Sequence, residues 1–254
     1  MYRLGLENII RNRKYTYYKY ILIIDMKYIY LYIFILFNVI IFVSCLNIYY
    51  DGFEHFDLNK NKIILLGDSV IKNNAYVSYG KSIEDILVEK TNGKTICYAV
   101  DNSKIANVYN QIGKIPSSLG LNDENTLVFL SVGGNDILFY YLENNHNSAN
   151  TSILQNIFTD YKNLIEAIRF KLPRAKLYLL DLYYPANEKY IHLYHIIAEW
   201  NRLIYSLADN LQNNISGVIK ISSLLKNNED FYYEIEPSSV GGQKIAESIL
   251  EINL

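Results

Sequence analysis

The chain has 254 residues, half of them hydrophobic, and a formal net charge of -2. This length allows one sizeable α/β domain with an additional segment, and the lack of a basic field argues against a nucleic-acid partner. Tyrosine is abundant, at 25 residues, together with Ile, Asn and Lys. We interpret this as a compositional bias, so aromatic runs alone are weak evidence for binding.

The first feature in chain order is an uncharged, apolar run over residues 28–50. About 20 such residues span the hydrocarbon core of a bilayer as a helix, so we predict one N-terminal transmembrane helix that acts as a signal-anchor. Basic residues precede the run and acidic residues follow it. The positive-inside rule then makes residues 1–27 a cytoplasmic basic tail. We expect a single-pass membrane protein with a linker over residues 51–61 and with residues 62–254 on the non-cytoplasmic side.

A second interpretation of this segment starts at Met26. Met26 and Lys27, followed by an apolar stretch that ends at Cys45, are similar to a bacterial lipoprotein signal, in which the cysteine is lipidated after cleavage. Phe42 departs from that pattern. In both interpretations the domain is tethered outside the cytoplasm. A disulfide between Cys45 and Cys97 is not expected, because both lie in apolar runs.

From residue 62 onward, short apolar runs alternate with helical patterns. The runs predict strands at Lys62–Leu66, Thr95–Val100, Thr126–Val132, Lys176–Leu182 and Gly217–Ile221. Apolar residues at helical spacing predict helices at Ser82–Lys90, Lys104–Ile112, Ile153–Leu172, Glu188–Leu211 and Ser238–Leu250. Alternating strands and helices favour a parallel sheet covered on both faces. Residues 62–254 are therefore expected to form a flavodoxin-like three-layer α/β/α domain with a five-stranded parallel sheet, with Trp200 in its core.

Polar residues follow the first three predicted strands. These segments are Gly67-Asp68-Ser69, Asp101-Asn102-Ser103 and Gly133-Gly134-Asn135-Asp136. Because the carboxyl ends of parallel strands meet at one edge of a sheet, we expect the three segments to converge. A serine on a strand-to-helix turn exposes its hydroxyl as a nucleophile needs. Backbone amides and an asparagine side chain can surround one carbonyl as an oxyanion hole.

These segments, in this order, resemble those of the SGNH hydrolase superfamily, the GDSL-like lipases and esterases. The matching blocks are Leu66–Val70, Tyr98–Ser103, Ser131–Asp136 and Glu236–Ala246. The resemblance covers residues 62–254 and implies that Ser69 is the nucleophile. It also implies an oxyanion hole formed by the backbone amides of Ser69 and Asn102 and the side-chain amide of Asn135. The implied reaction is hydrolysis of a lipid ester, an acetylated glycan or a small acyl ester, with no cofactor and no metal.

The chain departs from this family at the general base. The family places a catalytic Asp three residues before a catalytic His, and these positions hold Tyr233 and Glu236 here. A serine hydroxyl is a poor nucleophile without a base. Glu236 is one candidate, because partial burial raises the pKa of a carboxyl group towards a useful value. A second is His192 or His195, and a third alternative is that the site does not hydrolyse esters.

Other acids have structural interpretations. Asp230 is the nearest acid in the same segment, six residues before Glu236. Glu236 itself could stabilise the start of a helix whose first residue is Pro237. Asp68 is expected to organise its loop, and Asp136 to accept a structural hydrogen bond.

Two alternatives to an ester hydrolase stay open at the level of the whole protein. One is a degenerate module that binds a glycan or an acyl ligand without turnover. The other is an anchored scaffold for a partner protein. Acyl transfer to another hydroxyl, in place of hydrolysis, is also open.

Overall fold

The computed structural model describes residues 38, 61–143 and 151–252. By its internal contacts the chain divides into residues 1–58 and 59–254. Apart from residues 38 and 61, the predicted basic tail, transmembrane helix and linker lie outside the described residues, as does Cys45. Among the helices that are described, none is long and apolar enough to cross a membrane.

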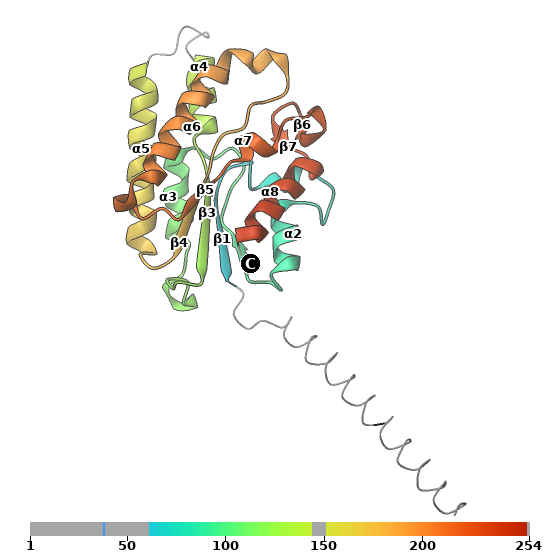
Figure 1. The fold of residues 1–254 in the computed structure, drawn as a ribbon, viewed down its shortest axis with the longest axis vertical. Helices are drawn as coiled ribbons and strands as arrows, with labels where there is room; N and C mark the ends of the chain where they lie inside the picture. Colours follow the sequence, from blue (N-terminus) through green and yellow to red (C-terminus); the bar gives the residue numbers. More distant parts are fainter. Residues whose placement is uncertain (1–37, 39–60, 144–150, 253–254) are drawn as a thin grey trace, which may run out of the picture. The chain divides into compact units, whose positions relative to one another are not determined.

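Five parallel strands form the central sheet, in the order β2-β1-β3-β4-β5 (Figure 1). Their bounds are β1 Lys62–Gly67, β2 Thr95–Cys97, β3 Thr126–Ser131, β4 Lys176–Leu180 and β5 Gly217–Ile219. Each strand begins at the predicted residue, and the prediction of a five-stranded parallel sheet is confirmed. This strand order is the flavodoxin-like one, in which ligands bind at the carboxyl ends beside the first strand.

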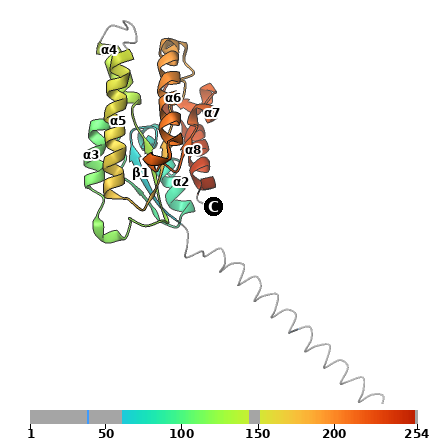
Figure 2. The same cartoon turned by 60° about the vertical axis from the view of Figure 1, so that its left-hand side comes forward.

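Helices cover both faces of the sheet (Figures 1 and 2), which confirms the three-layer arrangement. One face carries α3 (Ile105–Gly113), α4 (Gly134–Glu143), α5 (Thr151–Lys171) and α6 (Tyr194–Asp209). The other carries α2 (Ile83–Lys90), α7 (Ile221–Leu224) and α8 (Ser239–Ile252). Short 3-10 helices lie at η1 Asn73–Tyr76, η2 Ser117–Leu119, η3 Glu188–Leu193, η4 Leu211–Asn213 and η5 Asn228–Asp230. A small antiparallel hairpin pairs β6 (Phe231–Tyr232) with β7 (Glu236–Pro237).

Two helical segments differ from the prediction. The single helix expected over residues 188–211 is divided into η3, α6 and η4, because the core-facing stripe of Ile197, Trp200 and Ile204 belongs to α6 alone. The helix α4 was not predicted. Its first residues are glycine and asparagine, which are typical of loops.

The core consists of two apolar layers, one on each side of the sheet. Along β1, Ile63 and Leu65 contribute to one layer while Ile64 and Leu66 contribute to the other. This explains why the strand is continuously apolar, since no side of it meets water. Trp200 is fully buried, as predicted, with its ring 5.2 Å from that of Tyr161.

The end of β1 lies close against the backbone of β3. Gly67 has a φ of +131°, and a Cβ atom there would lie 1.8 Å from the carbonyl oxygen of Ser131 on β3. Only glycine fits this approach and this backbone conformation. The turn that follows carries Asp68 and Ser69 out of the sheet.

We expect Gly67→Ala to lower the free energy of unfolding by at least about 2 kcal/mol, because the added methyl group forces the two strands apart. The measurement is urea unfolding of the full-length chain, followed by the fluorescence of its one tryptophan. Gly93→Ala is the matched control: its φ is +79°, but nothing lies within 4 Å of the added Cβ. It should lose only about 1 kcal/mol, from backbone conformation alone. Equal losses in the two variants would contradict the close approach.

Candidate active site

The loops after β1, β2 and β3 meet at the carboxyl edge of the sheet, as expected. The backbone N–H of Asp68 donates to the carbonyl of Ser131, at 3.0 Å, and the N–H of Val100 donates to the carbonyl of Gly67, at 3.1 Å. The Asn135 side chain in turn donates to the carbonyl of Ser103, at 3.0 Å. The three polar segments therefore form one connected unit.

The buried side chain of Gln111 fixes this unit to α3. Gln111 on α3 accepts a hydrogen bond from the Gly67 N–H and donates one to the Gly67 carbonyl, both at 2.8 Å. The same amide nitrogen donates to the Ser103 hydroxyl at 3.1 Å. Gln111 thus ties the end of β1 to the loop after β2. Sequence reasoning missed it, because a single glutamine on a helix carries no local signal of this role.

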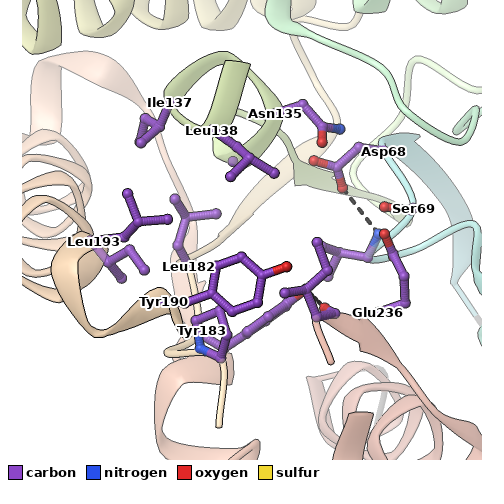
Figure 3. Close-up of a pocket in the computed structure, with 15 residues that line it drawn as sticks. Asp68, Ser69, Asn135, Ile137, Leu138, Leu182, Tyr183, Tyr190, Leu193 and Glu236 are labelled. Carbon is purple, nitrogen blue, oxygen red and sulfur yellow. Dashed lines mark hydrogen bonds between the residues drawn. The ribbon is translucent and has the colours of Figure 1, made fainter. Parts of the chain in front are cut away.

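Ser69 lies in a pocket at this edge, with 6 % of its surface exposed. The pocket has a volume of about 80 Å³, and Ser69, Asn135 and Glu236 all line it (Figure 3). The structure therefore brings together three of the four predicted site residues, although Ser69 and Glu236 are 167 residues apart in the chain. The site depends on the tertiary fold and not on any one motif.

The geometry expected of an oxyanion hole is present in part. Asn102, the fourth predicted residue, adopts a φ of +59°, the left-handed conformation that asparagine tolerates. It is exposed and does not line the pocket. The hydrogen bonds of the described residues leave the backbone N–H groups of Ser69 and Asn102 without a protein acceptor. The Asn135 amide nitrogen donates one of its two hydrogens to the Ser103 carbonyl, and its other hydrogen is available to a ligand.

Glu236 is half-buried on β7 and has its carboxyl group at the pocket. Burial raises the pKa of this group, hydrogen bonding with the Ser69 side chain lowers it, and the nearby Asp101 carboxylate raises it; the net shift is upward. Its Oε2 atom is buried and has no hydrogen-bond partner among the described residues. A carboxylate in this state binds a proton more readily than an exposed one, as a general base must.

Two side chains from distant loops hold the backbone on either side of Glu236. The Tyr183 hydroxyl donates to the carbonyl of Ile235. The fully buried Asn73 donates to the carbonyl of Pro237, at 3.3 Å, and accepts from the N–H of Ile83, at 2.9 Å. Because Asn73 belongs to the segment that leaves Ser69, this bond couples the position of β7 to that of the serine loop.

The β6–β7 hairpin turns through strained backbone. Tyr233 and Glu234 have φ values of 46° and 74°, which are uncommon for residues with large side chains. The interpretation of Pro237 as the first residue of a helix is wrong: Glu236 and Pro237 form β7, and α8 begins at Ser239. The Ser238 hydroxyl caps α8 instead, accepting from the N–H of Val240 at 3.1 Å.

The other candidates for a base lie elsewhere. His192 and His195 are exposed, and neither lines the pocket. Asp230 is fully buried; its carboxylate pairs with Lys244 at 2.6 Å and accepts from two backbone amides of its own loop. Burial acts to raise the pKa of Asp230, but these hydrogen bonds outweigh it and the pKa is lowered. Asp230 therefore anchors the segment before Glu236 and does not line the pocket.

Asp68 and Asp136 have the structural contacts that were expected of them. Asp136 on α4 accepts from the N–H of Ile105, the first residue of α3, at 3.1 Å. Asp68 accepts from the N–H of Val70 at 3.1 Å and from the Ser131 hydroxyl at 3.3 Å. Unlike Asp136, Asp68 also lines the pocket.

The rest of the pocket wall is mostly apolar, with Tyr183 and Tyr190 as further polar members. It includes Leu138, Leu182, Leu193 and Ile197, which lie on the side of α4, α6 and the end of β4. Asn201 on α6 fixes Leu182 by bonding both its N–H, at 2.8 Å, and its carbonyl, at 2.7 Å. Within the described part of the chain, no cluster of three or more His, Cys, Asp or Glu side chains could hold a metal ion.

The chain is similar to known proteins in structure, and no match is found from its sequence. No protein-family model matches the chain, and no curated protein matches its sequence. A solved structure of a member of the lipolytic protein G-D-S-L family from Veillonella parvula has a TM-score of 0.57 and 20 % identity. That match covers 75 % of this chain and 96 % of the other.

Two further solved structures are similar. Phospholipase A1 from Streptomyces albidoflavus has a TM-score of 0.52 and 14 % identity, over 77 % of this chain and 100 % of the other. An acetyl xylan esterase from Geobacillus stearothermophilus has a TM-score of 0.54 and 12 % identity, over 76 % of this chain and 94 % of the other. Residues 61–252 of this chain therefore have the SGNH hydrolase-like fold that its sequence motifs predicted.

Proposed function

We propose that this protein is an SGNH-type serine esterase in which Ser69 is the nucleophile and Glu236 is the general base. One observation carries the proposal: the Glu236 carboxyl group and the Ser69 side chain line one pocket, which Asn135 also lines. A carboxylate base and a serine hydroxyl in one pocket, beside an available amide donor, are the groups that acyl transfer requires. The glutamate occupies the position at which the related family has histidine.

The proposed reaction has two halves. In the first, Ser69 Oγ attacks the ester carbonyl carbon while Glu236 accepts the hydroxyl proton. The Asn135 amide and the backbone N–H groups of Ser69 and Asn102 stabilise the negative oxygen that forms. Glu236 then returns the proton to the leaving alcohol as the ester bond breaks. In the second half, Glu236 takes a proton from a water molecule as the water oxygen attacks the acyl carbon on Ser69. Glu236 then returns that proton to Ser69 Oγ as the bond between the acyl carbon and Oγ breaks and the carboxylic acid leaves.

The size of the pocket favours a short acyl group. Its volume of about 80 Å³ compares with roughly 10–15 Å³ for a single water measured in the same way. The apolar wall formed by Leu138, Leu182 and Leu193 suits a methyl or short alkyl group. The similar structures include a phospholipase and an acetyl xylan esterase, so both a lipid and an acetylated glycan are compatible alcohol components.

A second candidate function is ligand binding without turnover. It is favoured by one observation, the replacement of the family's Asp and His by Tyr233 and Glu236. The two functions differ in the reactivity of Ser69. A phosphonate ester probe labels an activated serine and leaves an inactive one unmodified.

We also propose that the segment over residues 28–50 tethers the domain to a membrane, with the domain on the non-cytoplasmic side. This rests on the length and charge pattern of the sequence.

Ser69→Ala should reduce kcat/KM for a nitrophenyl acetate by at least about 10³-fold, because the nucleophile is lost. Asn135→Ala should reduce kcat by about 10²-fold with little change in KM, because its amide acts on the oxyanion and not on the ground state. Steady-state kinetics of the full-length protein measure both. Gln243→Ala, at an exposed position of α8, serves as a control with wild-type kinetics. Activity that survives in Ser69→Ala would exclude the serine mechanism.

The activity should fall as the pH is lowered through the pKa of Glu236, since only the ionised carboxylate accepts a proton. That pKa is raised, so the acid limb of kcat/KM should lie above the usual pH range in which glutamate ionises.

Glu236→Gln should lose about 10²–10⁴-fold in kcat. Glu236→His should keep activity and place the limb near about pH 6.5. Asp101→Asn removes a charge that raises the pKa of Glu236 and should move the limb to lower pH. If the acid limb of kcat/KM does not move in Glu236→His or in Asp101→Asn, the limb belongs to a group other than Glu236.

The full-length protein should remain in the membrane fraction after washing with alkaline carbonate. Cys45→Ala distinguishes the two interpretations of the segment. An apparent mass that is the same in this variant as in the unmodified protein is expected for an uncleaved transmembrane helix, whereas a larger apparent mass of the variant would identify a lipoprotein whose cleavage before Cys45 is lost. Release of the unmodified protein would contradict membrane tethering altogether.

A further inference from the structure

Asp68 is a second carboxyl group in the pocket. The proposed mechanism assigns it no role. It directly precedes Ser69, only 2 % of its surface is exposed, and it lines the pocket together with Asn135 and Glu236 (Figure 3). Its role as an organiser of the serine loop uses only one of its two oxygens. Oδ1 accepts from the Val70 N–H and the Ser131 hydroxyl, at 3.1 Å and 3.3 Å.

The second oxygen, Oδ2, has no hydrogen bond among the described residues. It is the polar atom that Asp68 presents to the pocket. An ionised carboxylate at this position would lie beside the carbonyl oxygen of the substrate, on which negative charge develops during the attack by Ser69. Like charges at such separations in a buried site repel strongly. A neutral carboxyl at the same place has the opposite effect, because its O–H can donate a hydrogen bond.

The surroundings favour the neutral form. No Lys, Arg or His side chain lines the pocket in the described part of the chain. The titratable groups that face Asp68 are all acidic or phenolic: Glu236 on β7, Asp136 on α4, Tyr161 on α5 and Tyr183 after β4. Burial raises the pKa of Asp68 to about 8; the Val70 and Ser131 hydrogen bonds oppose the rise, and repulsion from Glu236 and Asp136 adds to it.

We infer that Asp68 takes part in the reaction as a neutral carboxylic acid, whose O–H donates a hydrogen bond to the oxyanion beside Asn135. This rests on the proposed esterase function. Two carboxyl groups of one pocket then have opposite duties: Glu236 is active when ionised and Asp68 when protonated. The enzyme works in the pH interval between the two ionisations. Asp68 keeps its proton throughout the cycle, so the proton balance of the ester hydrolysis is unchanged.

The test is the alkaline limb of kcat/KM for a nitrophenyl acetate, measured on the full-length protein between about pH 5 and pH 10. The rate of Ser69→Ala is subtracted at each pH. The wild type should lose about tenfold per pH unit above about pH 8. Asp68→Asn has an amide that donates but does not ionise, so its profile should stay flat there. Asp209→Asn is the matched control, an acid-to-amide change at the exposed end of α6, and should keep the limb.

A purely structural Asp68 gives a different result: Asp68→Asn lowers the activity at every pH and keeps the alkaline limb, which overturns the inference. Tryptophan fluorescence at each pH shows that the variants stay folded. If Asp68→Asn does not fold, Ser131→Ala takes its place. This change removes a hydrogen bond that lowers the pKa of Asp68, so it should move the limb to higher pH, and an unmoved limb contradicts the inference. If Ser69→Ala is as active as the wild type, the proposed function itself fails.

Discussion

The close approach of Gly67 to Ser131 is the constraint on which the site depends. It places the end of β1 directly against β3, where the Asp68 N–H bonds the Ser131 carbonyl and the Ser131 hydroxyl bonds the Asp68 side chain. Gln111 then connects the same point to the loop after β2. The loop that carries Ser69 is thus held by the backbone of β3 and by a buried amide. A reacting serine needs a fixed position of this kind, because small displacements cost much of the advantage of orientation.

The electrostatics of the pocket follow from burial without a compensating cation. Glu236 and Asp68 both enter an apolar, partly enclosed space, and burial is the largest cause of the raised pKa of each. Catalysis needs such displaced pKa values, which a surface carboxyl does not have. Hydrogen bonds from the Tyr183 and Asn73 side chains to the backbone on either side of Glu236 help to hold this residue and the strained turn at Tyr233 in place. Tyr233 and Glu236 occupy the positions at which the SGNH hydrolases that the sequence resembles have Asp and His.

The parts of the site that sequence patterns could predict are those that follow strands. Ser69 and Asn135 each come directly after a buried apolar run, and parallel strands bring such segments to one edge. The positions of Gln111, Asn73 and Tyr183 could not be predicted. Each is a single polar residue in a chain rich in Asn and Tyr, and each bonds a backbone group at least 44 residues away. The helix α4 was missed for a related reason: its glycine and asparagine start is typical of a loop, and only its packing on the sheet makes it helical.

By itself the sequence determined the first residue of each of the five strands, the parallel sheet that they form, and the edge at which the polar segments converge. These follow from local periodicity, since apolar runs and helical stripes report which surfaces must be buried. It left Glu236, His192 and His195 as alternative candidates for a base, beside the alternative that the site does not hydrolyse esters. Only the tertiary structure placed Glu236 at Ser69 and the histidines on the surface. The physical reason is that a proton acceptor is defined by its distance and its burial, and both arise when segments far apart in the chain pack together.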